Sequence, residues 1–193
     1  GDGLVRDTFE GRWASGWDIS AVCRTSRANT WCAFVSLDAT GNRECSLFRN
    51  PSADLFLDEA QIRPDMFNDC AGLHFCSVDL VDWPVRQAHR RAIELAREAG
   101  ALISFDPNVR LPLWDDPADC QAAIRAFLPF ADLVKLSDDE VEFVTGCTDE
   151  REAAKQLFAG GCKLLLVTRG AHGSAVYPPP TEAFTETLSV PRT

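Results

Sequence analysis

The chain has 193 residues, of which 46% are hydrophobic, and carries a formal net charge of −10; this suits one globular domain with a sizeable core. The acidic balance, without any run rich in Lys and Arg, argues against a nucleic-acid partner. No apolar stretch reaches membrane-spanning length, and the opening GDGLVRDTFEG lacks the regions of a signal peptide. We therefore expect a cytoplasmic protein with no membrane partner.

The chain contains eight cysteines, which are scattered along it. They form no CxxC pair and no Cys/His spacing of the kind that binds zinc, so a zinc site is not expected. Several lie in apolar, strand-like runs, which favours free, buried thiols in a reducing compartment. The positions are 23, 32, 45, 70, 76, 120, 147 and 162.

The first part of the chain predicts a β-hairpin. Residues 1–22 have the character of a loop and a short helix, and residues 30–37 and 43–49 read as strands. The five residues between them, DATGN, contain a glycine and are typical of a hairpin turn. A hairpin ahead of alternating strands and helices is expected to be an accessory lid or an extra edge.

The rest of the chain alternates between strand-like and helix-like segments. Such alternation predicts an α/β fold, with a mostly parallel sheet covered by helices. The expected strands are 72–77, 101–105, 131–136, 162–168 and 175–177, and the expected helices are 83–99, 117–128, 137–145 and 151–159.

Polar residues follow the strand at 101–105, in the segment SFDPNVR. In open α/β sheets, ligands bind at the carboxyl ends of the strands. Asp106 accepts hydrogen bonds from hydroxyl groups, Asn108 adds an amide, and Arg110 offers a planar fork of donors. The three residues suit a hydroxylated, anionic or phosphorylated ligand. An ordinary turn with a surface arginine is an equal alternative on spacing alone.

A second polar cluster, SDDE, follows the strand at 131–136. It stands at the start of a helix, where free backbone N–H groups bind phosphate and carboxylates such as Glu140 reach a magnesium ion directly or through water. The alternative is an ordinary N-cap at Ser137 with acids in the first turn.

A third cluster, TRGAHGS, follows the strand at 162–168. Gly170 and Gly173 permit a close approach of backbone to a ligand, and Thr168 offers a hydroxyl. The segment is neither a Walker loop nor the GxGxxG motif of a dinucleotide fold, and a plain turn is an equal alternative.

Five segments together carry a family resemblance. SFDPNVRLPLW, ADLVKLSDDEVEFVTG and LLLVTRGAHGSAVY, preceded by ANTWCAFVSLDATGNRECSLFRNPSADLFL and GLHFCSVDL, resemble the ribokinase-like (PfkB-type) carbohydrate kinases, and within them the bacterial fructokinases. The most specific parts are the DPNxR loop and the NPSAD turn. The match covers nearly the whole chain.

The resemblance implies a fold and an activity. The fold is a three-layer αβα arrangement around a mostly parallel sheet, with residues 1–28 and 54–193 in the core and residues 29–53 in a β lid. The activity is transfer of the γ-phosphoryl group of ATP, with Mg²⁺ on the phosphates, to a hydroxyl of a small sugar, fructose by resemblance. Ribose, a nucleoside or 2-keto-3-deoxygluconate remain alternatives. A homodimer that pairs through the lid is also expected.

The resemblance assigns the sugar-side residues. Phe48 and Arg49 match lid positions that close over the sugar. Asp106 and Asn108 match the loop that lines the sugar–phosphate end of the cleft. Arg110 matches the catalytic position, where it acts on charge that develops on the transferred phosphoryl group.

The resemblance also assigns the nucleotide side. Ser137 stands where the family's NxxE motif has Asn, and Glu140 keeps the acid that positions magnesium through water. Thr168, Gly170 and Gly173 match the nucleotide-side loop. Arg169, between them, occupies a position that is commonly apolar.

Two family segments are not found in the sequence. The Gly-Gly/Asn segment that helps to hold the sugar would precede residue 1, and no GAGD loop, which carries the general base and an anion hole, occurs in these 193 residues. Phosphoryl transfer depends on that electrostatic stabilisation, so we expect little or no activity from this chain alone. The alternative function is a non-catalytic sugar- or nucleotide-binding or pairing module derived from such a kinase.

Overall fold

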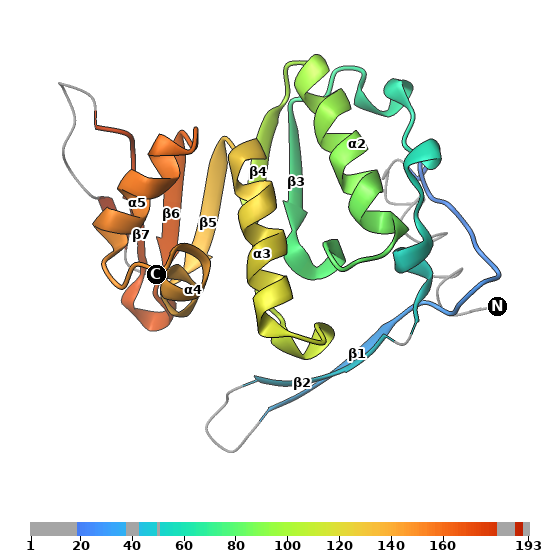
Figure 1. Cartoon of the computed structure of the whole chain (residues 1–193), viewed down its shortest axis with the longest axis horizontal. Helices are drawn as coiled ribbons and strands as arrows, with labels where there is room; N and C mark the ends of the chain where they lie inside the picture. The colour runs from blue at the N-terminus through green and yellow to red at the C-terminus, as the bar shows by residue number, and fades with distance from the viewer. Residues whose placement is uncertain (1–18, 38–42, 50, 181–187, 191–193) are drawn as a thin grey trace.

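The structure, a computed structural model, describes residues 19–37, 43–49, 51–180 and 188–190. Strands β1 (Cys32–Leu37) and β2 (Arg43–Phe48) pair antiparallel, with Phe34 opposite Ser46. The predicted hairpin is therefore confirmed, and it projects beside the rest of the molecule (Figure 1). The predicted turn at 38–42 and the short helix within 1–22 fall wholly or mainly outside the described residues.

The second sheet has six strands, in the order β3-β4-β5-β6-β7-β8. The first four are parallel, as predicted, and β7 and β8 run antiparallel to their neighbours. The last strand was not expected from the sequence. The bounds are β3 (Gly72–Cys76), β4 (Leu102–Asp106), β5 (Leu133–Ser137), β6 (Leu164–Thr168), β7 (Ser174–Tyr177) and β8 (Leu188–Val190).

Four helices connect the parallel strands, close to the predicted ranges, and their ends follow from local chemistry. Asp116 and Asp149 accept backbone N–H groups at two of the N-termini, and prolines open two helices at a position where no donor is needed. Gly100, which follows the first helix, has φ +77°, a backbone conformation that favours glycine. The helices are α2 (Pro84–Glu98), α3 (Pro117–Phe127), α4 (Asp138–Thr145) and α5 (Glu150–Ala159).

Helices cover one face of the six-stranded sheet (Figure 1). The four parallel strands are neighbours in sequence order, and because such crossovers are right-handed as a rule, every connecting helix falls on the same side. On that side Phe75 and Phe105 are buried and stack with their ring centroids 4.4 Å apart. On the opposite side Leu102 remains 48% exposed. Of the three layers expected, the described residues thus form two, the sheet and one layer of helices.

Short 3-10 helices occupy segments for which the sequence predicted neither helix nor strand, apart from Ser77 and Leu128 at the ends of a predicted strand and a predicted helix. A single turn has too few residues to show a hydrophobic period, so these segments carry no periodic signal. The bounds are η1 (Ala53–Phe56), η2 (Glu59–Gln61), η3 (Pro64–Phe67), η4 (Ser77–Asp79), η5 (Leu111–Leu113), η6 (Leu128–Phe130) and η7 (Gly170–His172).

The seven cysteines whose side chains the structure describes, all except Cys45, are free thiols, as expected, but not all are buried. Cys120 and Cys162 lie in the core, whereas Cys23 and Cys32 are exposed. The prediction of burial was wrong for Cys32 because both faces of the two-stranded hairpin lie open in this structure. Within the described residues, no helix combines the length and apolarity needed to cross a bilayer.

Candidate active site at the carboxyl edge of the sheet

The three predicted polar clusters meet at one edge of the sheet. Asp106, Ser137 and Thr168 are the last residues of β4, β5 and β6, and Ser137 lies opposite Thr168 in the parallel register. Because adjacent parallel strands end at the same edge, the loops that follow them are neighbours. The prediction that Asp106, Glu140 and Gly170 share one edge is confirmed.

Asp106 organises the first loop. Its Oδ2 lies 3.0 Å from Nζ of Lys135 on the neighbouring strand, and its Oδ1 accepts the backbone N–H of Asn108 at 3.1 Å. Asn108 has φ +47°, in the left-handed region that Asn tolerates better than most residues. The turn is thus held by the carboxylate, and the Asn108 side chain is displayed half-buried beside it.

Glu140 ties the second cluster to the first. Its Oε1 accepts the backbone N–H of Val109 at 2.6 Å, and its Oε2 accepts that of Ser137 at 2.8 Å. The second contact belongs to a capping box at the start of α4, so the ordinary N-cap and the loop anchor coexist. Each oxygen keeps one further acceptor position, which suits contact with a magnesium-bound water better than direct ligation. Among the described residues, no three His, Cys, Asp or Glu side chains gather as a ready-made metal cage.

Arg110 is exposed at the end of the DPNVR loop, just before η5. Its Nη1 donates to the carbonyl of its neighbour Val109 at 2.8 Å, and no acidic side chain in the described region pairs with it. Most of its donor fork is therefore available to an anionic ligand.

The third loop is shaped by its glycines. Gly170 has φ +53° with no atom within 4 Å of where a Cβ would stand, and Gly173 has φ +84° and ψ −148°, a combination that L side chains rarely adopt. Thr168 Oγ1 donates to the carbonyl of Leu136 at 3.4 Å, which links the loop to β5.

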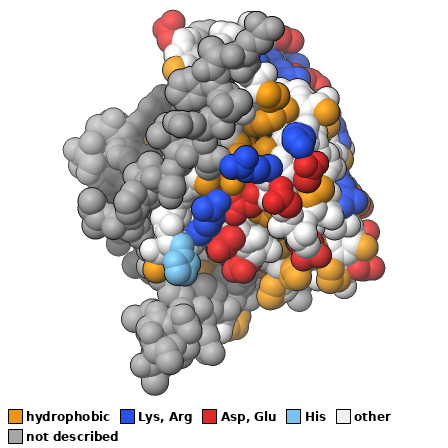
Figure 2. All heavy atoms as spheres, turned by 90° about the vertical axis from the view of Figure 1, so that its left-hand side faces the viewer, with side chains coloured by type: hydrophobic (Ala, Val, Ile, Leu, Met, Phe, Trp, Pro, Cys, Tyr) orange, Lys and Arg blue, Asp and Glu red, His pale blue; other side chains and the backbone are white. Residues whose placement is uncertain are grey.

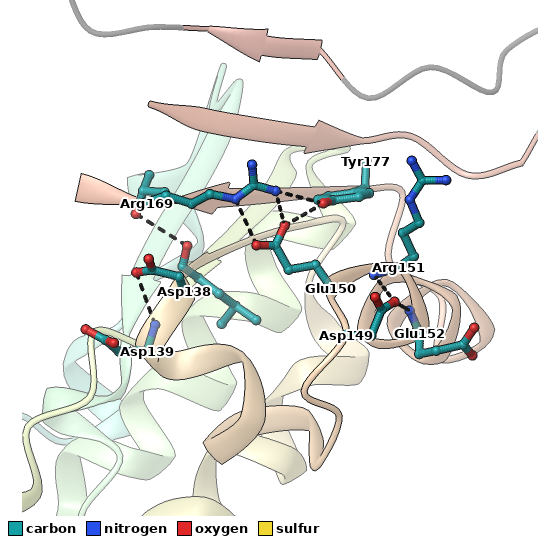
Figure 3. A network of polar contacts seen from close by, with 10 residues as sticks. Asp138, Asp139, Asp149, Glu150, Arg151, Glu152, Arg169 and Tyr177 are labelled. Atoms are coloured by element: carbon teal, nitrogen blue, oxygen red, sulfur yellow. Dashed lines mark hydrogen bonds and ion pairs between the residues drawn. The ribbon is translucent and has the colours of Figure 1, made fainter. Parts of the chain in front are cut away.

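Arg169 anchors this loop through a network shown in Figure 3. Its Nε and Nη2 donate to the two carboxylate oxygens of Glu150 at 2.9 and 2.5 Å, and the Tyr177 hydroxyl donates to the same carboxylate. The paired guanidinium holds the pKa of Glu150 below its usual value, whereas burial and this carboxylate raise the pKa of Tyr177 to about 12. Figure 2 shows acidic and basic side chains intermixed on this end of the molecule.

Arg49, at the end of the hairpin, is not displayed to a ligand as expected for a lid residue. Its side chain is 3% exposed. The guanidinium donates to Asp54 from Nε at 2.9 Å and from Nη2, to Asp79 from Nη2, and to the carbonyl of Val78 from Nη1. Burial raises the pKa of Asp79, against the opposing effect of Arg49.

A cavity of about 920 Å³ lies beside the base of the hairpin. Of the predicted site residues, Phe48 and Arg49 line it; Asp106, Asn108 and Arg110 belong to the strand edge next to it. The hairpin base and the loop after β4 both contact η4: Arg49 donates to Val78 and Asp79, and the backbone N–H of Ser77 donates to the carbonyl of Pro107 at 3.0 Å. The cavity walls also include Trp83, Arg86, Trp114, Asp82, Asp115 and Asp119.

Sequence reasoning missed Lys135, Asp79 and Glu150 as members of these networks. Lys135 carried a usable signal, since it is a charged residue within an otherwise apolar strand and lies two positions before the strand end. Asp79 and Glu150 gave none, because their partners are 30 and 19 residues away in the chain.

Comparisons with known proteins agree on one family. A model of the pfkB family of carbohydrate kinases matches residues 14–192. Fructokinase-2 of Solanum lycopersicum is 44% identical over 151 residues, which cover 78% of this chain and 46% of the tomato protein. The chain therefore spans about half the length of the curated relatives that it matches.

Solved fructokinases share the fold. The enzyme of Vibrio cholerae O395, in its fructose-, ADP- and calcium-bound form, is 29% identical with a TM-score of 0.82, over 98% of this chain and 59% of its own. The Xylella fastidiosa enzyme with bound ATP is 30% identical with a TM-score of 0.77, over 95% of this chain and 57% of its own.

Proposed function

Because the chain belongs to the pfkB family of carbohydrate kinases, we propose that it serves the ATP-dependent phosphorylation of a sugar, with fructose as the acceptor. The observation that carries this proposal is the meeting of three polar loops at the carboxyl edge of β4, β5 and β6. The resemblance assigns sugar, phosphate and nucleotide contacts to those same loops. Fructokinases among the relatives favour fructose over ribose or a nucleoside.

On the sugar side, Asp106 and Asn108 bind hydroxyl groups from the loop after β4, and Phe48 covers the sugar from the hairpin. Arg110 directs its free donors at the transferred phosphoryl group, where negative charge develops. Four of the five N–H donors of Arg49 already bind protein oxygens. This residue therefore holds the lid in place and does not bind the sugar.

On the nucleotide side, the residues fit ATP and Mg²⁺. The start of α4 offers phosphate the positive end of its helix dipole, although the N–H groups of Ser137 and Asp139 already donate to carboxylates of the same turn. Glu140 would hold a magnesium-bound water. Gly170 and Gly173 leave the loop after β6 open to the nucleotide, and Thr168 adds a hydroxyl. When bound, the metal ion neutralises phosphate charge; the loops of this chain position the groups around it.

The experiment that tests the function is a coupled assay of ADP release, with and without fructose. The 193-residue chain is compared with a chimaera in which it replaces the matching half of tomato fructokinase-2. We expect sugar-dependent turnover in the chimaera and little or none in the chain alone. Binding of fructose or ATP without turnover in either protein would favour the non-catalytic module instead.

We further propose that the hairpin pairs two copies of the chain in the cytoplasm. Phe34 is 66% exposed and Val35 is 58% exposed, and as neighbours in a strand they point to opposite faces of the hairpin. The Phe34 face also carries Phe48, which lines the cavity, so the Val35 face is left for the partner copy. Sedimentation should give a dimer for the chain and a monomer for Val35→Asp; a monomeric parent chain would contradict the pairing.

A further inference from the structure

We propose that Asp54 and Asp79, by enclosing Arg49, restrict this site to uncharged sugars and exclude sugar acids. The inference rests on the proposed function and names its substrate class. It starts from one unexpected finding: a guanidinium placed at the lid base, beside the cavity, is withdrawn from ligands by the protein's own carboxylates.

The geometry leaves Arg49 almost no capacity for an external anion. Both hydrogens of Nη2 are taken, one by Asp54 and one by Asp79, and Nε donates to Asp54 as well. Nη1 donates one of its two hydrogens to the carbonyl of Val78. A planar fork binds a carboxylate well only when two parallel donors are free, and here they are not.

The two acids are themselves held in place. Ser52, which is buried, donates its hydroxyl to the other oxygen of Asp54, and Asp54 lies within η1. Asp79 ends η4, directly after β3, and is drawn to the hairpin base by Arg49. Breaking one partner of such a partly buried ion cluster is costly, so the arrangement will not open readily for a ligand.

The acidic side chains around the cavity also disfavour a sugar acid. Two carboxylates surround one guanidinium at the hairpin base, and the cavity wall adds Asp115 and Asp119, for which the described residues provide no cationic partner. Arg86, the other guanidinium of the wall, is paired with Asp82. With the cavity wall and the hairpin base taken together, carboxylates outnumber guanidinium groups by five to two. A sugar carboxylate would therefore meet like charge, which is a repulsive means of specificity.

A neutral sugar suffers no such penalty. Hydroxyl groups donate to carboxylates, and Trp83, Trp114 and Phe48 offer flat apolar walls. The same Arg49 cluster also fixes the hairpin to the loop after β3. It thereby has a positioning role, since the covering residue Phe48 immediately precedes Arg49.

The test is equilibrium binding of D-fructose and of D-gluconate, measured by calorimetry on the chimaera with tomato fructokinase-2 as the parent protein and on its variants. The parent should bind gluconate at least about tenfold more weakly than fructose. Asp54→Asn and Asp79→Asn each replace a carboxylate that holds the Arg49 fork with a weaker, uncharged acceptor of the same size. Each should therefore narrow the preference for fructose over gluconate about tenfold. Asp119→Asn removes one negative charge from the cavity wall but leaves Arg49 enclosed, so it should narrow the preference for fructose less. Asp65→Asn, an exposed acid paired with Arg63 away from the cavity, should leave it unchanged.

Thermal melting identifies any variant that does not fold, in which case the other single variant decides. Hydrogen exchange of the β1 and β2 amides is the second readout, because loosening the cluster should speed exchange there in Asp79→Asn but not in Asp65→Asn. If a folded variant binds fructose with the parent's preference for fructose over gluconate, the inference about Arg49 is wrong, whereas the proposed function still stands. Absence of fructose binding by the parent would contradict the proposed function. Unchanged hydrogen exchange of the β1 and β2 amides in Asp79→Asn would then also contradict the positioning role of the Arg49 cluster.

Discussion

The carboxylate of Glu140, at the start of α4, accepts the backbone N–H of Val109, in the loop after β4, at 2.6 Å. The contact joins two strand-end loops that are 31 residues apart in the chain. Since the same carboxylate caps its own helix through Ser137, one side chain fixes both the loop after β4 and the start of α4. Positioning of this kind is the main protein contribution in phosphoryl transfer.

Replacing Glu140 with Gln should therefore destabilise the protein. The amide keeps one acceptor oxygen but turns an NH₂ group toward a backbone donor, so one of the two hydrogen bonds is lost. The expected loss is about 1–2 kcal/mol of unfolding free energy, measured by urea denaturation. Glu142→Gln, an exposed acid on the same helix, is the matched control. Equal stability of the two variants would show that Glu140 does not anchor the loop.

The left-handed conformation of Asn108 separates a backbone role from a side-chain role. Glycine accepts φ +47° freely and alanine does not, so Asn108→Gly should be more stable than Asn108→Ala by about 1 kcal/mol. Both variants lose the amide that we propose binds the sugar, so both should raise KM for fructose in the chimaera. If Asn108→Ala were the more stable variant, the turn would not impose the left-handed backbone.

The Arg169–Glu150–Tyr177 network predicts a particular pH dependence of stability. The pKa of Glu150 is lowered in the folded protein, so its contribution is present above the ordinary value of 4.5 and is lost as the pH falls through the lower, folded value. The pKa of Tyr177 is raised to about 12, so its contribution is present below 10 and is lost as the pH rises toward 12.

Glu150→Gln removes the charged partner and should cost about 1–3 kcal/mol at neutral pH, with a smaller decline below pH 4.5 than in the parent. Denaturation curves at several pH values measure both effects. Glu152→Gln, whose carboxylate pairs with Lys155 on the exposed side of α5, should change stability little. A parent-like acid decline in Glu150→Gln would mean that other carboxylates control it.

The sequence predicted the sheet well because short apolar runs, such as the one that forms Leu133–Ser137, lie between clear helix signals. The site residues at strand ends followed from the same pattern. What the sequence did not reveal were contacts between distant segments: Asp106 with Lys135, and Arg49 with Asp79. Such pairs depend on which strand lies beside which, and on the path of single-turn helices that carry no period. For Arg49 the residue was identified, but its engagement by two acids was not.

Arg110 decides whether the loop after β4 acts on the transferred phosphoryl group. The measurement is transfer of label from [γ-³²P]ATP to fructose by the chimaera, with Arg110 intact or replaced by Lys or Met. We expect Arg110→Lys to lose activity because the bidentate fork is gone, and Arg110→Met to lose more, on the order of 10²-fold. The loss should fall on kcat more than on KM, since the contact forms mainly in the transition state. A kcat for Arg110→Met within about twofold of the parent would instead make Arg110 a surface residue of a turn, and would contradict the assignment of this loop to catalysis.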